Sequence, residues 1–221
     1  MSISTLLESE KLQQYVINHA NVQWPEVQKN MIYDAVSQEH AQMNTSLDQL
    51  QFLSFLIKLT GAVNAIEIGV FRGIGSLAIA KNLPHDGKLI ACDVTDEYVK
   101  DFKRYWKEAG VYGKIDLRIA PATETLAHLI KEQKQATFDF MYIDADKVNN
   151  ETYYEYGLQL LRTGGLMAVD NVLAGGKVSE DHEQKERVKL ARKFNEKVAN
   201  DTRVDASLLS IGDGLYLIRK K

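Results

Sequence analysis

The chain has 221 residues with 45% hydrophobic and 26% charged side chains, a size and balance typical of one soluble globular domain. Its formal charge of −3, from 27 Lys and Arg against 30 Asp and Glu, argues against nucleic acid as a partner. The single cysteine excludes an internal disulfide and a multi-cysteine zinc site, and neither a membrane span nor a signal peptide is recognisable, so we expect a cytoplasmic protein with no membrane partner.

Apolar residues at helical spacing characterise the first part of the chain, and we expect residues 1–60 to form a helical extension packed on the core of the domain. One helix is indicated by the apolar positions within 6–19. Pro25 suits the first turn of a second helix. A third helix is predicted to begin at Ser46, with the glutamine three residues later as a capping-box partner, and to end at Gly61.

Short apolar runs alternate with helical stretches after Gly61, which predicts right-handed crossovers between parallel strands. We expect strands at 62–69, 88–93, 115–119, 138–144 and 165–170. Helices are expected at 74–83, 96–109, 122–134, 149–162 and 181–199. A glycine-rich turn joins two further strands into a hairpin, at 204–209 and 215–218. The fold class is therefore α/β, and we expect residues 61–221 to form a doubly wound, Rossmann-like, mostly parallel seven-stranded sheet with an antiparallel last strand.

Acidic residues gather where the predicted strands end. The first strand ends in Glu67-Ile68-Gly69, and later strands end in Asp93, Asp144 and Asp170-Asn171. Ligands of open α/β sheets bind at the carboxyl ends of the strands. This edge of the sheet is therefore the predicted binding site.

The segment from Glu67 to Gly75 closes the first strand and opens a helix, with glycines spaced G-x-x-x-G-x-G. This spacing differs from the G-x-G-x-x-G of dinucleotide sites. The Glu67 carboxylate would repel a pyrophosphate, so a cation or zwitterion such as a sulfonium amino acid fits better. Asp93 lies 24 residues after Gly69 and is placed to accept both hydroxyls of a ribose, which a nicotinamide enzyme would also need.

These motifs resemble those of the cation-dependent O-methyltransferases, the family of caffeoyl-CoA and catechol O-methyltransferases. The resemblance covers about 40–219 of the chain. The pairing of D-A-D-K with D-N-V-L is specific to the family, whereas the glycine loop alone is not. The segments that carry the resemblance are Met43–Leu53, Glu67–Gly69, Asp144–Lys147, Gly164–Gly165, Asp170–Leu173 and Gly212–Gly214.

The resemblance implies S-adenosylmethionine as the cofactor and assigns residues to its parts. The methionine part would be surrounded by Met43, Thr45, Glu67 and Gly69. The ribose would bind Asp93, the adenine would lie by Ala122, and the methionine ammonium would lie near Asp144. Gly75 belongs to the same set, although the family usually has serine at this position.

Asp144, Asp170 and Asn171 form a candidate metal site. Asp144 and Asp170 are 26 residues apart, about one helix and one strand, so adjacent parallel strands would bring their ends together. Three hard oxygen ligands suit a divalent cation, with Mg²⁺ first and Ca²⁺ or Mn²⁺ as alternatives. Such a cation would favour ionisation of a phenol, whose pKa is about 10 in water. A vicinal hydroxyl would chelate the same ion, which predicts a catechol-like acceptor.

Lys147 occupies the position of the family's general base, and a nearby cation would favour its neutral form. The alternative for Lys147 is a solvated surface lysine, and for Asp170-Asn171 it is a helix cap. The family commonly has aromatic residues at the positions of Asn150 and Ala174. Specificity for caffeoyl-CoA is therefore not carried over to this chain.

The predicted function is transfer of a methyl group from S-adenosylmethionine to a hydroxyl of a small phenolic acceptor. A nicotinamide-dependent dehydrogenase on the same kind of sheet is one alternative, opposed by the glycine spacing and by Glu67. A cofactor-binding protein without catalysis is another, opposed by the intact metal and base positions. The family often forms dimers, so we expect a homodimer.

Overall fold

The computed structural model describes residues 10–20 and 24–221. The part of the first predicted helix that precedes Glu10 lies outside these residues. The described α-helices are α1 (Glu10–His19), α2 (Glu26–Val36), α3 (Leu47–Thr60), α4 (Ile74–Asn82), α5 (Lys103–Glu108), α6 (Ala122–Lys131), α7 (Asn150–Leu160) and α8 (Glu186–Ala199). Short 3₁₀ helices occupy Ala41–Met43, Tyr112–Lys114 and Lys177–Ser179. No helix within these residues combines the length and apolar character needed to cross a membrane.

The sheet confirms the predicted α/β class. Its seven strands lie in the order β3-β2-β1-β4-β5-β7-β6. Parallel pairing joins the first five strands of that order, and β7 runs antiparallel to both of its neighbours. The strands are β1 (Asn64–Ile68), β2 (Lys88–Asp93), β3 (Ile115–Ile119), β4 (Phe138–Ile143), β5 (Leu161–Val169), β6 (Val204–Leu209) and β7 (Leu215–Lys220).

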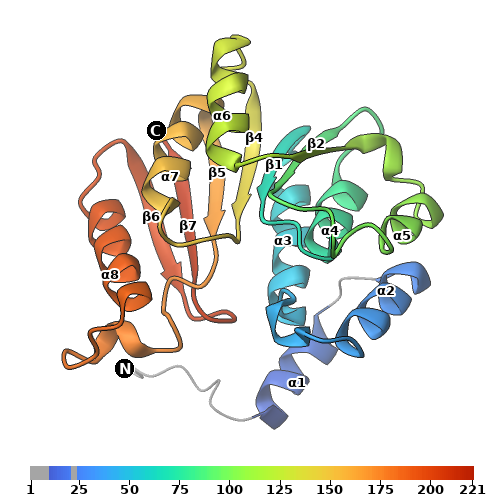
Figure 1. Ribbon diagram of the computed structural model, residues 1–221, viewed down its shortest axis with the longest axis horizontal. Helices are drawn as coiled ribbons and strands as arrows, with labels where there is room; N and C mark the ends of the chain where they lie inside the picture. The colour runs from blue at the N-terminus through green and yellow to red at the C-terminus, as the bar shows by residue number, and fades with distance from the viewer. Residues whose placement is uncertain (1–9, 21–23) are drawn as a thin grey trace.

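Helices cover both faces of the sheet, with α3, α4 and α5 on one side and α6, α7 and α8 on the other (Figure 1). Strand residues alternate between the two resulting cores because successive side chains point to opposite faces. In β1, Ala65 belongs to the core under α3 and α4, whereas Ile66 and Ile68 belong to the core under α6 and α7. This alternation also directs the Glu67 side chain toward α4.

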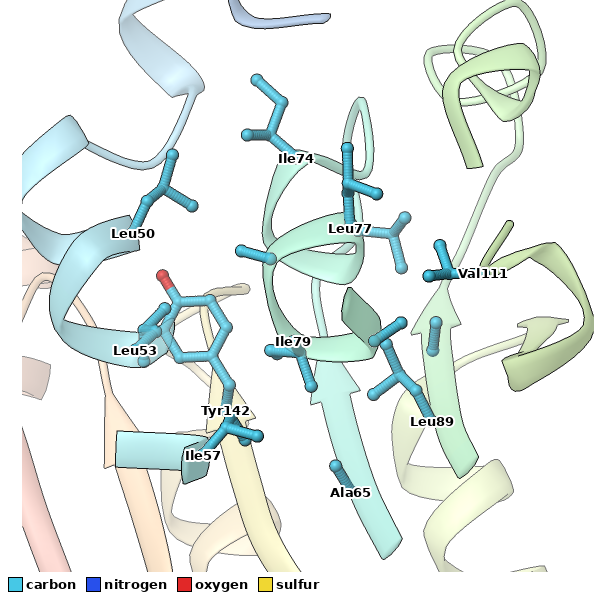
Figure 2. Close-up of a cluster of buried hydrophobic side chains, with 14 of the residues drawn as sticks. Leu50, Leu53, Ile57, Ala65, Ile74, Leu77, Ile79, Leu89, Val111 and Tyr142 are labelled. Carbon is cyan, nitrogen blue, oxygen red and sulfur yellow. The ribbon is translucent and has the colours of Figure 1, made fainter. Parts of the chain in front are cut away.

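The core between α3 and α4 contains an aromatic residue with a polar tip. Leu50, Leu53 and Ile57 of α3 face this core and are almost completely buried. Tyr142 of β4 lies among these side chains in Figure 2, with its hydroxyl pointing toward the carboxyl ends of the strands. The apolar core therefore positions the Tyr142 hydroxyl at the edge of the sheet where the strands end in acidic residues.

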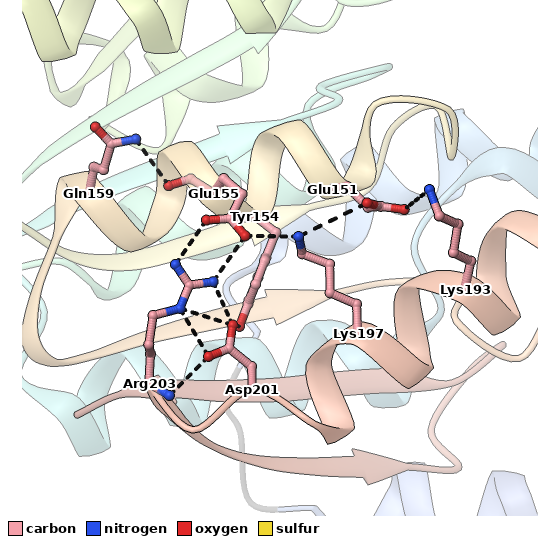
Figure 3. A network of polar contacts seen from close by, with 8 residues as sticks. All are labelled: Glu151, Tyr154, Glu155, Gln159, Lys193, Lys197, Asp201 and Arg203. Atoms are coloured by element: carbon pink, nitrogen blue, oxygen red, sulfur yellow. Dashed lines mark hydrogen bonds and ion pairs between the residues drawn. The ribbon is translucent and has the colours of Figure 1, made fainter.

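A polar network attaches the last hairpin to α7 (Figure 3). The Arg203 guanidinium donates to both carboxylate oxygens of Glu155, at 3.0 and 2.9 Å, and also binds Asp201. The Tyr154 hydroxyl donates to Asp201 Oδ2 at 2.8 Å. Lys197 of α8 pairs with Glu155 at 2.9 Å. The network holds α8 and β6 against α7, and it lies outside the acid-rich edge of the sheet.

Several predicted boundaries differ from the structure. Residues 97–102 form turns, so α5 is shorter than the helix predicted over 96–109, and α8 begins at Glu186. β5 begins at Leu161, inside the predicted helix, because this residue pairs with Phe138 of β4. The predicted capping box is also wrong, since the Ser46 hydroxyl donates to Asp48 Oδ1 at 2.6 Å.

Candidate active site

A cavity of about 750 Å³ lies at the carboxyl ends of the parallel strands. Ten of the eleven predicted site residues line this cavity: Met43, Thr45, Glu67, Gly69, Gly75, Asp93, Ala122, Asp144, Asp170 and Asn171. Lys147 does not line it, but its Nζ donates to the Asp170 backbone oxygen at 2.9 Å. Residues from widely separated segments therefore meet at one place.

The order of the strands explains this meeting. β1 lies between β2 and β4, so the chain turns in opposite directions on its two sides, and a crevice opens at this switch point. Backbone hydrogen bonds continue past the strand ends: Asp144 N donates to Ile68 O at 2.8 Å, and Asp170 N donates to Ile143 O at 2.9 Å. The three loops that follow β1, β4 and β5 consequently begin side by side.

Gly69 marks the closest approach between two of these loops. Its φ of +91° lies in the region that favours glycine, and a Cβ placed on it would lie 1.9 Å from the Asp144 carbonyl oxygen. Any other residue would push the β1 and β4 loops apart. The glycine is therefore required by the backbone contact that builds the floor of the cavity.

Glu67 is a buried carboxylate in this floor, with 1% of its surface exposed. Burial is the main reason that its pKa rises to about 8, and the negative charges of Asp144 and Asp93 add to the rise. The Ser76 hydroxyl donates to Glu67 Oε2 and opposes the rise. A Cβ on Gly75 would lie 2.4 Å from Glu67 Oε1, so the absent side chain leaves room for the carboxylate. A buried acid of this kind is suited to a cationic ligand.

Asp93 organises the loop after β1. Its Oδ2 accepts hydrogen bonds from the backbone N–H groups of Val70 and Phe71, both at 2.9 Å. Its Oδ1 accepts a longer bond from Thr95 N, at 3.3 Å. The Asp93 carboxylate thus supports the loop and also lines the cavity. A carboxylate can accept further hydrogen bonds, which the two hydroxyls of a ribose would need.

Asp170 is buried and Asp144 is half-buried, and the two form a pair of like charges on the side of Glu67 opposite to Asp93. Burial raises the pKa of both groups, and the Asp170 charge raises that of Asp144 further. The Tyr142 hydroxyl donates to Asp170 Oδ2 at 3.1 Å and lies 3.4 Å from Asp144 Oδ2. It accepts a hydrogen bond from Gln49 Nε2 at 2.8 Å. A single hydroxyl proton compensates little of this charge, so the pair suits a bound cation.

The donor set fits a divalent cation of the oxygen-binding kind. Within the described residues no group of three or more His, Cys, Asp and Glu could hold a metal ion, so the amide of Asn171 would have to complete the two carboxylates. Asn171 has a φ of +55°, in the left-handed region that asparagine tolerates better than most residues. Two carboxylates and one amide oxygen match the preference of Mg²⁺, which keeps water in its remaining positions.

Lys147 is the half-buried cation beside these acids. Burial lowers the pKa of its amine, while the charges of Asp144 and Asp170 oppose that shift. The amine is thus closer to its neutral form than an exposed lysine, although it lies next to carboxylates.

The loop after β5 is held by hydrogen bonds with the turn before β7 and with α8. Asp213, in the turn before β7, lines the cavity and accepts a hydrogen bond from Gly175 N at 2.6 Å. Arg192 of α8 donates to backbone oxygens of this loop, including those of Val178 at 3.0 Å and Glu183 at 2.9 Å. Asn150 and Ala174, where the family commonly has aromatic residues, are both buried.

Sequence reasoning missed the roles of Tyr142 and Gln49. Tyr142 shares a face of β4 with Phe140 and lies two residues before Asp144, so strand alternation was a signal that could have pointed to it. Gln49 was assigned to a helix cap, and its contact with Tyr142 spans 93 residues of sequence. No local pattern predicts that contact.

Comparison with known proteins agrees with this arrangement. A family model described as O-methyltransferase matches residues 18–221. The chain is 41% identical to a probable caffeoyl-CoA O-methyltransferase 2 of Dictyostelium discoideum, over 93% of this chain and 90% of that protein. It is 37% identical to catechol O-methyltransferase domain-containing protein 1 of Mus musculus, over 96% and 81%. An O-methyltransferase from Bacillus cereus, crystallised with SAH, is 26% identical with a TM-score of 0.85, over 96% of this chain and 97% of that one.

Proposed function

The chain belongs to the O-methyltransferase family, and from this membership we propose that it transfers the methyl group of S-adenosylmethionine to a hydroxyl of a small vicinal diphenol, with the help of a divalent cation. The observation that carries the proposal is one cavity that contains Glu67 and Asp93 together with the pair of Asp144 and Asp170. Membership of this family argues against the two alternative functions, which were a nicotinamide-dependent dehydrogenase and a cofactor-binding protein without catalysis.

The cofactor half of the proposal rests on the charges of the cavity floor. Glu67 and Asp144 would face the positive charges of S-adenosylmethionine, and Asp93 would accept its ribose hydroxyls. The structural relative from Bacillus cereus was crystallised with SAH, the demethylated product of this cofactor. The close contact of Gly69 with Asp144 keeps side chains out of this part of the floor.

The acceptor half rests on Asp144, Asp170 and Asn171. These residues would hold the divalent cation, which when bound supplies Lewis-acid stabilisation of a phenolic oxygen and a chelation site for a neighbouring hydroxyl. Lys147 would take the phenolic proton. S-adenosylmethionine would supply the methyl group to the acceptor oxygen, and the sulfur–methyl bond electrons would stay on the sulfur of the demethylated cofactor. Relatives named for caffeoyl-CoA and for catechol support an acceptor ring with adjacent hydroxyls.

A methylation screen tests the proposal directly. The purified protein is incubated with S-adenosylmethionine and a panel of vicinal diphenols and matched monophenols, with Mg²⁺ or with excess EDTA, and the products are identified by mass spectrometry. We expect methylated diphenols only when the cation is present. Methylation of monophenols at equal rates, or of no phenol at all, would contradict the proposed acceptor class.

Replacing Asp93 should weaken cofactor binding. Asp93→Ala is expected to reduce the affinity for S-adenosylmethionine by ~1.5–3 kcal/mol, the range for a hydrogen bond to a charged acceptor. Asp93→Asn keeps an oxygen for the loop N–H groups and should lose less. Asp116→Asn, on the exposed end of the neighbouring strand, is the matched control. Calorimetry measures the affinities, and an Asp93→Ala protein that binds like the wild type would remove Asp93 from the site.

The buried carboxyl of Glu67 predicts pH-dependent cofactor binding. Its pKa is about 8 in the ligand-free protein, whereas a cationic ligand needs the ionised form. Affinity should therefore fall as pH decreases below 8, by up to about tenfold per pH unit, and binding near pH 7 should release a proton. Calorimetry in buffers of different ionisation enthalpy measures both effects.

Glu67→Gln distinguishes the contribution of Glu67 to this pH dependence from that of the other acids of the cavity. The variant should bind the cofactor weakly and with a smaller pH slope. Folding raises the pKa of the Glu67 carboxyl, so this group destabilises the folded protein as pH rises from the carboxyl pKa of the unfolded chain toward 8. The ligand-free variant should consequently melt at a higher temperature than the wild type at pH 8.5. Equal slopes in the two proteins would show that another group carries the pH dependence.

A further inference from the structure

The segment that connects α2 to α3, residues 37–46, forms part of the wall of the candidate active site. This α2–α3 connection contains the short 3₁₀ helix Ala41–Met43. Residues 37–40, which precede that helix, are exposed to solvent. The residues that line the cavity follow directly after them: Gln42, Met43, Asn44, Thr45 and Ser46. The position of this wall therefore depends on how the exposed start of the connection is held.

Most hydrogen bonds of the connection are local. The Ser37 hydroxyl donates to Asp34 O of α2 at 2.8 Å. The Asn44 side-chain amide donates to Ala41 O, within the connection, at 2.8 Å. Within the part of the chain that the structure describes, one hydrogen bond joins residues 37–44 to a segment beyond α2, and its donor is Arg72.

Arg72 belongs to the glycine loop after β1, which Asp93 supports through neighbouring backbone N–H groups. The Arg72 side chain is 3% exposed, and its Nη2 donates to the backbone oxygen of Glu39. The guanidinium lies over the rings of Phe71 and Phe102, at 4.5 and 5.8 Å from their centroids. A buried cation thus joins the loop after β1 to the start of the α2–α3 connection.

Arg72 is buried without a carboxylate partner. It forms no ion pair with any described residue, and its Nη1 has no hydrogen-bond acceptor among them. Burying a charge is costly, and one carbonyl oxygen and two aromatic faces offset only part of that cost. An apolar side chain of similar length would be at least as stable at this position. The contact with Glu39 is therefore better explained by the placement of the cavity wall than by the stability of the fold.

A ring contact holds the same end of the connection. His40, next to Glu39, packs edge-on against Tyr98 with 6.3 Å between the ring centroids. Tyr98 in turn packs against Phe71 of the loop after β1, at 4.9 Å. Both contacts lie directly before the residues of the connection that line the cavity. The loops after β1 and β2 therefore hold this wall at one place.

We propose that Arg72 is a positioning residue for the cofactor, whose hydrogen bond to Glu39 holds the α2–α3 connection in place so that Met43 and Thr45 contact S-adenosylmethionine. The inference rests on the cofactor half of the proposed function, and Arg72 itself need not touch the cofactor. Without this bond the connection is in place in a smaller fraction of the molecules. The apparent affinity for the cofactor falls by the same fraction.

Two substitutions of Arg72 isolate the hydrogen bond. Met and Lys are both unbranched, and only Lys carries a charged donor. Calorimetry should show that Arg72→Met binds S-adenosylmethionine about tenfold more weakly than the wild type, as expected when a bond from a charged donor is lost, and that Arg72→Lys retains most of the affinity. Equal affinities of the two variants would overturn the inference. A wild type that bound no S-adenosylmethionine would instead overturn the proposed function.

Melting temperatures separate positioning from a structural role. The Glu39 carbonyl belongs to an exposed residue, so water can replace the lost donor, and ligand-free Arg72→Met should melt at or above the wild-type temperature. The matched control is Arg104→Met, which removes an exposed arginine that also binds α2, through Asp34 at 2.6 Å. This control should bind the cofactor like the wild type. A lower melting temperature of Arg72→Met with unchanged cofactor affinity would overturn the inference.

Amide hydrogen exchange tests the wild type as well as the variants. Met43 N donates to His40 O at 2.9 Å and Asn44 N donates to Ala41 O at 3.1 Å, so both amides report on the connection. We expect S-adenosylmethionine to slow exchange at these two amides in the wild type. In the ligand-free state Arg72→Met should accelerate it, and Arg104→Met should not. Exchange that the cofactor leaves unchanged in the wild type would overturn the inference, whether or not Arg72→Met folds.

Discussion

Asp170→Ala is expected to reduce methyl transfer by about 10²–10³-fold, the several kcal/mol that a Lewis-acid interaction supplies, and to leave the affinity for S-adenosylmethionine nearly unchanged. The physical reason is the position of Asp170, which lies beside Asp144 and accepts from Tyr142 at 3.1 Å, away from Asp93. Steady-state rates and calorimetric affinities together measure the two effects. Asn171→Ala should behave in the same way.

Asp144→Ala is the informative comparison for this prediction. Asp144 is proposed to serve both the cation and the methionine ammonium, so its loss should damage turnover and cofactor binding together. Excess EDTA should stop the wild-type reaction, and added Mg²⁺ should restore it. Full activity in excess chelator would show that these acids are structural. Loss of cofactor affinity in Asp170→Ala equal to that in Asp144→Ala would contradict the proposed division between the two.

Lys147→Ala is expected to lower turnover by roughly 10²–10⁴-fold, the usual contribution of a general base. The Lys147 amine is half-buried and donates to the Asp170 carbonyl oxygen at 2.9 Å, so it lies beside a proposed ligand of the cation. Lys147→Arg should not restore the rate, because a guanidinium stays protonated. Lys189→Ala, at an exposed position on α8, is the matched control and should keep the wild-type rate.

The acidity of the acceptor separates proton removal from positioning. A nitro-substituted catechol ionises more easily than catechol, so it needs less help from a base. The rate deficit of Lys147→Ala should therefore shrink with the nitro-substituted acceptor. A deficit of the same size for both acceptors would mean that Lys147 positions the substrate. An unchanged rate with both acceptors would remove Lys147 from the mechanism.

The residues that line the cavity at the ends of the strands could be predicted from sequence, because the signal is local. Strand periodicity locates the ends of the strands, and the residues that follow are read directly: Glu67, Asp93, Asp144 and Asp170. Parallel connections then require these ends to share one edge of the sheet. The cavity is lined by all four of these residues, although their chemical roles remain predictions.

Tertiary structure alone decided the contacts that tune those residues. The strand order places β1 between β2 and β4, and Gln49 contacts Tyr142; both depend on segments far apart in sequence. The packing of Gly75 on Glu67 joins neighbouring elements, and it depends on how α4 folds back onto β1. Local patterns report which face of an element is apolar, and they carry no information on what lies across that face. The capping box predicted at Ser46 was wrong because the Ser46 hydroxyl donates to Asp48 Oδ1 within the same turn, while the Gln49 Nε2 amide donates to the buried Tyr142 hydroxyl across the core.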